Sequence, residues 1–137
     1  MLIQKTIISV IELIPNAIGD ILHELSRTVS LSEKDTLDLN LILEESTTNA
    51  IHHGNQFDTG LTVQLSLELD QDMVTIRVKD EGRGFDYRNL PDLKESNEKM
   101  NPSGRGIFLI KRIADEVSFN EAGSEICVRK RIHPLKK

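Results

Sequence analysis

The sequence predicts an α+β fold, a two-layer sandwich in which helices cover one face of a mixed, mostly antiparallel sheet. One observation is a pair of strictly alternating apolar stretches joined by a short polar turn, a pattern typical of a β-hairpin with one buried face. Another is the order of the predicted elements, which is strand, two helices, two strands, a long loop, a helix and two strands. This order favours helices stacked on one face of an antiparallel sheet.

The N-terminal part of the chain is predicted to contain one strand and two helices. Residues 6–11 are rich in Ile and Val and predict a strand. Apolar residues recur at helical spacing over 15–28, and a second helix is expected over 33–53, where glycine and turn signals follow. Ser32 is the expected N-cap of the second helix, because the side chain of Asp35 can return the hydrogen bond as in a capping box.

The hairpin and a long loop dominate the second half of the chain. The two alternating strands are residues 61–69 and 74–78. Residues 86–103 contain two prolines and three asparagines without a sustained period, so they predict a long loop of the kind that is usually functional or mobile. A helix opened by a Gly-x-Gly segment comes next, and two strands around 117–119 and 124–132 end the fold.

Composition limits the classes of function. With 137 residues, 38% of them hydrophobic, the chain is expected to form a single domain over residues 1–137. Seventeen Lys and Arg against 22 Asp and Glu give a formal net charge of −5, a sign that disfavours direct nucleic-acid binding and a cationic membrane-surface role. No apolar run spans a bilayer, no signal peptide is visible and the single cysteine excludes an internal disulfide, so we expect a cytoplasmic protein.

Glu45 and Asn49 lie one turn apart in the helix predicted over 33–53. They continue an i, i+4 stripe that begins with Leu37 and Leu41, and such a stripe drifts by only about 40° at each step. A carboxylate and an amide are therefore expected side by side at the edge of the core face. Polar pairs of this spacing are also common at solvated helix ends, so the pair alone does not define a site.

Asp80 ends the second hairpin strand and is expected to face the core. The period of two that buries alternate residues over 74–78 leads directly to it, and a buried carboxylate is costly without hydrogen-bond donors. Gly82 and Gly84 follow in alternate positions, where the backbone can adopt positive φ and a flat ligand can approach it. A solvated Asp-Gly turn is the alternative for this segment.

Gly104, Arg105 and Gly106 open the last predicted helix. A glycine-rich helix start leaves free N–H groups at the positive end of the helix dipole, which favours anions, and Arg105 adds a full positive charge. The sequence contains neither a Walker P-loop nor a Rossmann glycine fingerprint, so those two classes of nucleotide site are excluded.

Taken together and in this order, the motifs resemble the ATP-binding superfamily of gyrases, heat-shock chaperones, histidine kinases and mismatch-repair ATPases, known as the Bergerat or GHKL fold. Within it the chain is most similar to the stand-alone anti-sigma factor serine/threonine protein kinases of bacteria. The resemblance spans essentially the whole chain and is carried by residues 43–54, 78–86 and 104–110, with 114–117 and 123–124 extending it.

The resemblance implies roles for the polar residues and glycines singled out in the first two motifs. Asn49 corresponds to the ligand of the Mg²⁺ that accompanies ATP, and Glu45 to the general base that accepts the proton of an attacking serine. Asp80 corresponds to the acceptor for the adenine amino group. Guanine presents a carbonyl oxygen there, so GTP is expected to be rejected. Gly82 and Gly84 are expected to let the base lie against the backbone.

The resemblance also places the later motifs around the nucleotide. Gly104 and Gly106 would let the chain wrap the phosphates, with Arg105 as a phosphate contact. The loop over about 86–103 would be the lid of the nucleotide site. Ser124 shares a strand face with the apolar residues after it and stands where the family commonly has a threonine near the adenine-binding aspartate.

The predicted function is therefore that of an anti-sigma regulatory kinase. It would bind Mg-ATP, phosphorylate a serine of a small anti-sigma antagonist protein and so control the release of a sigma factor. A homodimer is expected from the family tendency and from the apolar first strand. Two alternatives remain open, a nucleotide-responsive module that sequesters its partner with little or no kinase activity, and an ATPase without a protein substrate.

Overall fold

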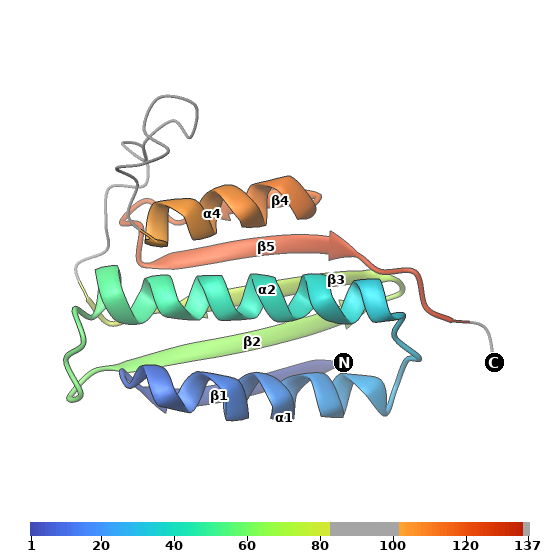
Figure 1. The fold of residues 1–137 in the computed structure, drawn as a ribbon, viewed down its shortest axis with the longest axis horizontal. Helices are drawn as coiled ribbons and strands as arrows, with labels where there is room; N and C mark the ends of the chain where they lie inside the picture. Colours follow the sequence, from blue (N-terminus) through green and yellow to red (C-terminus); the bar gives the residue numbers. More distant parts are fainter. Residues whose placement is uncertain (83–101, 136–137) are drawn as a thin grey trace.

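The structure, a computed structural model, describes residues 1–82 and 102–135, with the side chains of residues 102–104 left aside. The described residues form a five-stranded sheet with three α-helices lying side by side against one of its faces (Figure 1). This is the two-layer α+β architecture that the sequence predicts. None of the described helices is both long and apolar enough to cross a membrane.

The sheet has the strand order β1-β2-β3-β5-β4, and every pair of neighbours among these strands is antiparallel. The predicted hairpin is its centre, with β2 and β3 joined by a tight turn in which Gln71 has φ of 57°. β1 and β4 form the two edges. The strands are β1 (Leu2–Ile8), β2 (Thr62–Asp70), β3 (Met73–Lys79), β4 (Glu116–Phe119) and β5 (Glu125–Arg131).

The helices follow one another with short non-α segments. A 3₁₀ turn, η1 (Ile11–Leu13), leads into α1 (Ile14–Ser26). α2 (Glu33–Asn49) continues without a break into a π-helical turn, η2 (Ala50–Gly54), so the helical segment ends close to the predicted position. π-Turns are rare and often occur at functional sites. The last helix is α4 (Pro102–Ile113).

The core lies between the helices and the sheet. Alternation places one side-chain row of each inner strand against the helices, and α1, α2 and α4 each present an apolar stripe to it. Burying one Leu or Ile side chain in this layer contributes about 1.5–3 kcal/mol. The largest fully buried side chains are Ile21, Leu25, Leu39, Ile42, Leu43, Ile51, Leu65, Leu67, Ile76, Ile107, Ile110 and Ile132.

The first strand lies over Leu2–Ile8, so the strand predicted over residues 6–11 is confirmed for 6–8, but it begins earlier and residues 9–11 lie outside it. The run of Ile and Val continues past the point where the chain leaves the sheet. The Val10 N–H donates to the Ile8 carbonyl over 2.7 Å and turns the backbone into η1. Local hydrogen bonding therefore outweighs the strand preference of these side chains.

The start of α2 is capped as predicted, but Asp35 has a different role. The Ser32 Oγ accepts a hydrogen bond from the Asp35 N–H at 3.0 Å. The carboxylate of Asp35 accepts from the backbone N–H of His133 at 2.6 Å. Asp35 is thus buried by the C-terminal segment and holds that segment against the helix.

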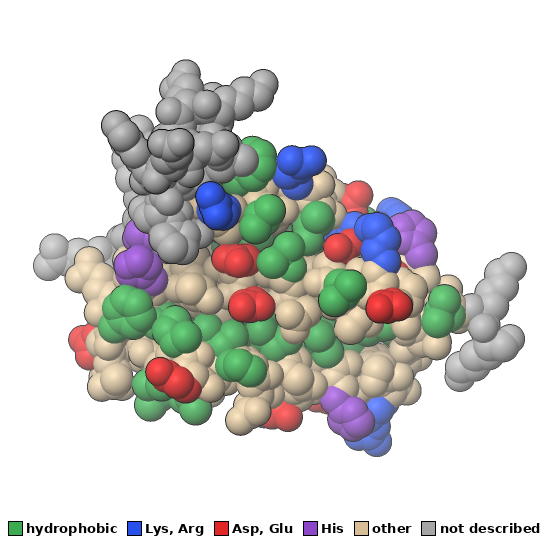
Figure 2. Space-filling view, in the orientation of Figure 1, with side chains coloured by type: hydrophobic (Ala, Val, Ile, Leu, Met, Phe, Trp, Pro, Cys, Tyr) green, Lys and Arg blue, Asp and Glu red, His purple; other side chains and the backbone are tan. Residues whose placement is uncertain are grey.

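The stripe on α2 begins in solvent, not in the core. Leu37 is 63% exposed, Leu41 and Glu45 are half-buried, and Asn49 is buried. The drift of an i, i+4 stripe explains this change, because each step rotates it further toward the sheet. Figure 2 shows acidic and apolar side chains side by side on this helix-covered face of the molecule. The apolar residues that α2 buries are Leu39, Ile42 and Leu43.

Candidate functional site

Three of the predicted site residues line one small cavity at the end of α2. Asn49 comes from the last turn of the helix, Asp80 from the residue after β3, and Ser124 from the residue before β5. The cavity has a volume of about 10 Å³, room for about one water molecule. Its other lining residues are Ser46, Ala50, Val78, Phe119, Gly123 and Ile126.

Asp80 is buried, with 5% of its surface exposed, as strand register predicts. Its Oδ1 accepts a hydrogen bond from the Gly82 N–H at 2.9 Å, and its own N–H donates to the Ser124 carbonyl at 2.9 Å. Burial raises the pKa of the Asp80 carboxyl, and the bond from Gly82 opposes part of that rise. The residue is therefore a buried acceptor held in place from both sides.

Two glycines let the Asp80 carboxyl occupy this position. A Cβ at Gly54 would lie 2.1 Å from the Asp80 Oδ2, and a Cβ at Gly82 would lie 1.6 Å from the Gly54 carbonyl oxygen. No side chain fits at either position, so the end of η2 and the end of β3 touch backbone to backbone. The sequence indicates Gly54 as a helix stop and as part of the motif over 43–54, but it does not predict the contact of Gly54 with Asp80.

The side chain of Asn49 has an oxygen without a hydrogen-bond partner among the described residues. Asn49 is 5% exposed, and its Oδ1 is fully buried. A buried acceptor left unpaired costs about 1–3 kcal/mol, which a ligand can recover. An amide oxygen suits Mg²⁺, which takes its remaining ligands from water and phosphate. This orphaned oxygen fits the metal role that the resemblance implies.

Among the described residues, Asn49 is not accompanied by a cluster of further metal ligands. Over residues 1–82 and 102–135 no group of three or more His, Cys, Asp and Glu side chains is placed to hold a metal ion. The hydroxyls of Ser46 and Thr47, one turn or less before Asn49, are also buried without a partner in that part of the chain. Mg²⁺ usually keeps several waters and binds phosphate oxygens, so a single amide ligand such as Asn49 is compatible with it.

Glu45 lies one turn before Asn49 and points toward α4. Its carboxylate occupies the space that a side chain at Gly106 would take, because a Cβ there would lie 2.3 Å from the Glu45 Oε2. Partial burial raises the pKa of Glu45, and the negative charge of Glu44 raises it further. Glu44 itself is exposed.

The Gly-x-Gly segment lies inside α4 and does not begin it. The helix starts at Pro102, so Gly104 falls in the first turn and Gly106 follows that turn. Gly106 is buried against Glu45, whereas Arg105 is exposed. Gly84 and the part of the predicted lid up to residue 101 lie outside the described residues.

Ser124 is held by the turn between β4 and β5. The Asn120 Nδ2 donates to the Ser124 Oγ at 2.9 Å, and the Asn120 Oδ1 accepts from the Ser124 N–H at 2.8 Å. Because the Ser124 carbonyl also accepts from the Asp80 N–H, the turn and the end of β3 form one hydrogen-bonded unit.

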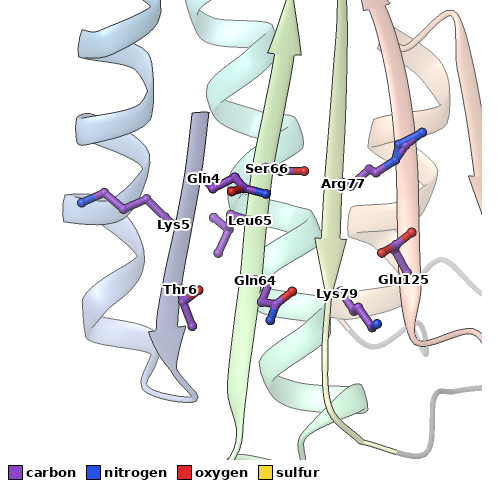
Figure 3. A pocket seen from close by; sticks show the side chains of 9 residues that line it. All are labelled: Gln4, Lys5, Thr6, Gln64, Leu65, Ser66, Arg77, Lys79 and Glu125. Atoms are coloured by element: carbon purple, nitrogen blue, oxygen red, sulfur yellow. The ribbon is translucent and has the colours of Figure 1, made fainter. Parts of the chain in front are cut away.

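A larger cavity, of about 360 Å³, lies on the opposite face of the sheet, which the helices leave uncovered (Figure 3). Its lining comes from β1, β2, β3 and β5 and includes Arg77, Lys79 and Glu125. None of the predicted site residues lines it. Asn49, Asp80 and Ser124 line the small cavity on the helix side instead.

Comparison with known proteins agrees with the fold and the motifs. The family model of the histidine kinase-like ATPase domain matches residues 12–130, and the chain belongs to this family. The matched range contains Glu45, Asn49, Asp80 and Ser124, so the family predicted from the sequence is confirmed.

Particular relatives are protein kinases by name. The chain is 28% identical over 106 residues to the serine-protein kinase RsbW of Staphylococcus aureus strain MSSA476, and the match covers 72% of this chain and 67% of the relative. The RsbW proteins of strains MW2 and JH9 match to the same extent.

Proposed function

We propose that this protein is a serine/threonine protein kinase that binds Mg-ATP and phosphorylates a serine of a small anti-sigma antagonist protein. The observation that carries the proposal is the pairing of two buried acceptors in one cavity, the orphaned Oδ1 of Asn49 and the carboxylate of Asp80. One suits a metal with its phosphates, and the other suits a purine amino group. The relatives named serine-protein kinase support the choice of serine as acceptor.

Asp80 selects adenine in this proposal. Its carboxylate accepts a hydrogen bond from the adenine amino group, and guanine would place a carbonyl oxygen against it. Because Asp80 is buried, an acceptor facing it leaves both groups unsatisfied, which costs about 1–3 kcal/mol or more. Ser124 helps to position Asp80, because its carbonyl accepts a hydrogen bond from the Asp80 N–H.

Glu45 and Asn49 act on the phosphates. Asn49 would hold the magnesium ion, which would supply positive charge to the phosphates. Glu45, one helical turn away, accepts the proton of the attacking serine hydroxyl. The new bond joins the serine oxygen to the γ-phosphorus of ATP, the bond to the β-phosphate oxygen breaks, and ADP leaves. The raised pKa of Glu45 suits this step, because it makes the carboxylate a stronger base.

The glycines and the arginine of α4 complete the phosphate site. The first N–H groups of a helix lack partners in the helix, and Gly104 lies in this first turn. Arg105 is exposed and supplies a positive charge to the phosphates. Gly106 keeps α4 close enough to α2 for Glu45 to lie between them. The cavity of about 10 Å³ has to widen when a nucleotide enters, since ligand pockets typically measure about 300–1,000 Å³.

The partners follow from the proposed activity. The substrate is the antagonist protein. A sigma factor is the second partner, and it is bound or released according to the phosphorylation state of the antagonist. These interactions are proposed to take place in the cytoplasm. A homodimer through β1 is the proposed oligomer, because this edge strand exposes Leu2 by 54% and Ile8 by 45%. Exposed edge strands of this kind pair readily with a second chain.

The proposed activity is tested with ATP labelled at the γ-phosphate and candidate antagonist proteins. We expect label on a serine of the antagonist with the wild-type protein and with Glu44→Gln, and a loss of about 10²–10⁴-fold with Glu45→Gln. The Glu44 variant is the matched control, because Glu44 is the exposed neighbour on the same helix; the substitution lowers the pKa of Glu45 but leaves its carboxylate in place.

Two other outcomes contradict the proposal. Binding of ATP without label on any partner would identify a nucleotide-responsive sequestering module. Release of phosphate in the absence of every partner would identify an ATPase without a protein substrate.

A further inference from the structure

Asn55 is a buried amide whose side chain joins three segments of the chain. It directly follows η2 and is 2% exposed. Its Nδ2 donates to the Ser9 Oγ at 2.8 Å and to the Thr62 carbonyl at 2.9 Å. Its Oδ1 accepts from the Glu81 N–H at 2.9 Å. Both amide hydrogens and the carbonyl oxygen therefore have partners.

One of these bonds holds the residue that follows Asp80. The Glu81 N–H belongs to the peptide that leaves Asp80, so its donation to the Asn55 Oδ1 fixes the direction of the chain after β3. Beside it, the Gly54 backbone lies against the Asp80 side chain and against Gly82. Gly54 and Asn55 thus form the wall along which the Asp80 carboxyl lies.

Asn55 is tied equally firmly to the end of α2. Its own N–H donates to the Ala50 carbonyl at 2.8 Å, which closes the π-turn directly after Asn49. One residue therefore connects the helix end that carries Asn49 with the strand end that carries Asp80. Asn49 and Asp80 both line the same cavity.

We infer that Asn55 is a positioning residue for base recognition, which sets the place of the Asp80 carboxyl relative to Asn49 through its bond to the Glu81 N–H. The inference rests on the proposed function for its effect on nucleotides, and on geometry alone for its effect on Asp80. Asn55 is 2% exposed and its side-chain amide is fully bonded within the chain, so we expect it to act through its neighbours. Its loss should change which base is preferred, and not only how stable the fold is.

Ser9 provides a control within the same network. It is buried to the same degree as Asn55, accepts from the Asn55 Nδ2 and donates to the Leu61 carbonyl at 2.9 Å. Ser9→Ala removes these bonds and leaves the Asn55–Glu81 bond in place. Ser9→Ala therefore removes hydrogen bonds of the same network as Asn55→Ala, but it keeps the bond that positions the Glu81 peptide after β3.

The experiment compares Asn55→Ala with Ser9→Ala, using variants that circular dichroism shows to be folded. With Asn55→Ala we expect ATP affinity and the ratio of ATP to GTP affinity each to fall about tenfold or more, which is the effect of one misplaced buried hydrogen bond. The pKa of the Asp80 carboxyl, followed by carbon NMR, should fall toward its ordinary value because water reaches the carboxyl. With Ser9→Ala the melting temperature should fall while the ratio and this pKa stay unchanged.

The inference is overturned if folded Asn55→Ala keeps the wild-type nucleotide ratio and Asp80 pKa, or if Ser9→Ala changes both as strongly. Where Asn55→Ala does not fold, hydrogen exchange of the wild-type protein decides: a protected Glu81 amide supports the inference, and an unprotected one overturns it. A wild-type protein that binds no ATP would contradict the proposed function, while the Asp80 pKa and the Glu81 exchange rate would still decide the link between Asn55 and Asp80.

Discussion

Replacing Gly106 by alanine should displace the proposed base without disturbing the fold. The new Cβ would lie 2.3 Å from the Oε2 of Glu45 and 3.1 Å from its Cδ. These atoms are the far end of a flexible side chain, so the carboxylate can rotate away at small cost, whereas backbone at that distance could not. A displaced Glu45 no longer reaches the serine hydroxyl.

The magnitudes separate the two effects of this substitution. Alanine in a helix interior is about 0.8–1 kcal/mol more favourable than glycine, and this gain offsets the cost of moving Glu45. We expect the free energy of unfolding to change by less than about 1 kcal/mol. A general base contributes about 10²–10⁴-fold to a rate, so phosphoryl transfer should fall by that factor at saturating ATP.

Gly19→Ala is the matched control, because Gly19 is also helical and a Cβ there meets nothing within 4 Å. It should raise the free energy of unfolding by about 0.8–1 kcal/mol and leave transfer unchanged. Chemical denaturation measures the stability of both variants, and label transfer at saturating ATP measures the rate. Wild-type transfer by folded Gly106→Ala would refute the role of Glu45 as the base.

Four further predictions concern Asn49, Asp80 and Glu45. Asn49→Ala should abolish the magnesium-dependent part of ATP binding, measured by titration calorimetry with magnesium or with EDTA; equal affinities in the variant and the wild type would remove Asn49 from the metal site. Asp80→Asn should lose the preference for ATP over GTP, and retained preference would mean that adenine is recognised elsewhere. The pKa of Asp80 is raised in the folded protein, so the folded state binds this proton more tightly than the unfolded state does. Wild-type stability then falls as pH rises from about 3.8 through the pKa of the folded protein. Asp80→Asn has no such proton, so its stability should not change with pH in this way. The transfer rate should rise as pH increases above 4.5, because Glu45 must lose its proton to act as a base and its pKa is raised above that value. A rate that does not change with pH above 4.5 would argue against a carboxylate base.

The parts of the site that sequence predicts are those that depend on short-range periodicity. Strand alternation places Asp80 on the buried face, because each residue of a strand faces opposite to the one before it. Helical spacing places Glu45 beside Asn49, because four residues make slightly more than one turn. The order of elements and the antiparallel hairpin follow from the same two periods.

The contacts that sequence does not predict join segments far apart in the chain. Gly54 touches Asp80 across 26 residues of separation, the same separation as the Asn55–Glu81 bond, and neither segment alone indicates its partner. The π-turn after Asn49 closes with the bond from the Asn55 N–H to the Ala50 carbonyl, and the Asn55 side chain bonds to Ser9, Thr62 and Glu81, which no local pattern in the sequence indicates. α4 likewise begins at Pro102, two residues before Gly104, which the sequence predicts at the start of this helix.

An NMR titration of the wild-type protein with Mg-ATP tests the central claim most directly, since it locates the bound nucleotide residue by residue. We predict that the side-chain amide of Asn49 and the backbone amides of Gly82 and Ser124 shift together in one saturable transition. The absence of any shift, or shifts confined to Arg77 and Lys79 on the uncovered face of the sheet, would contradict it.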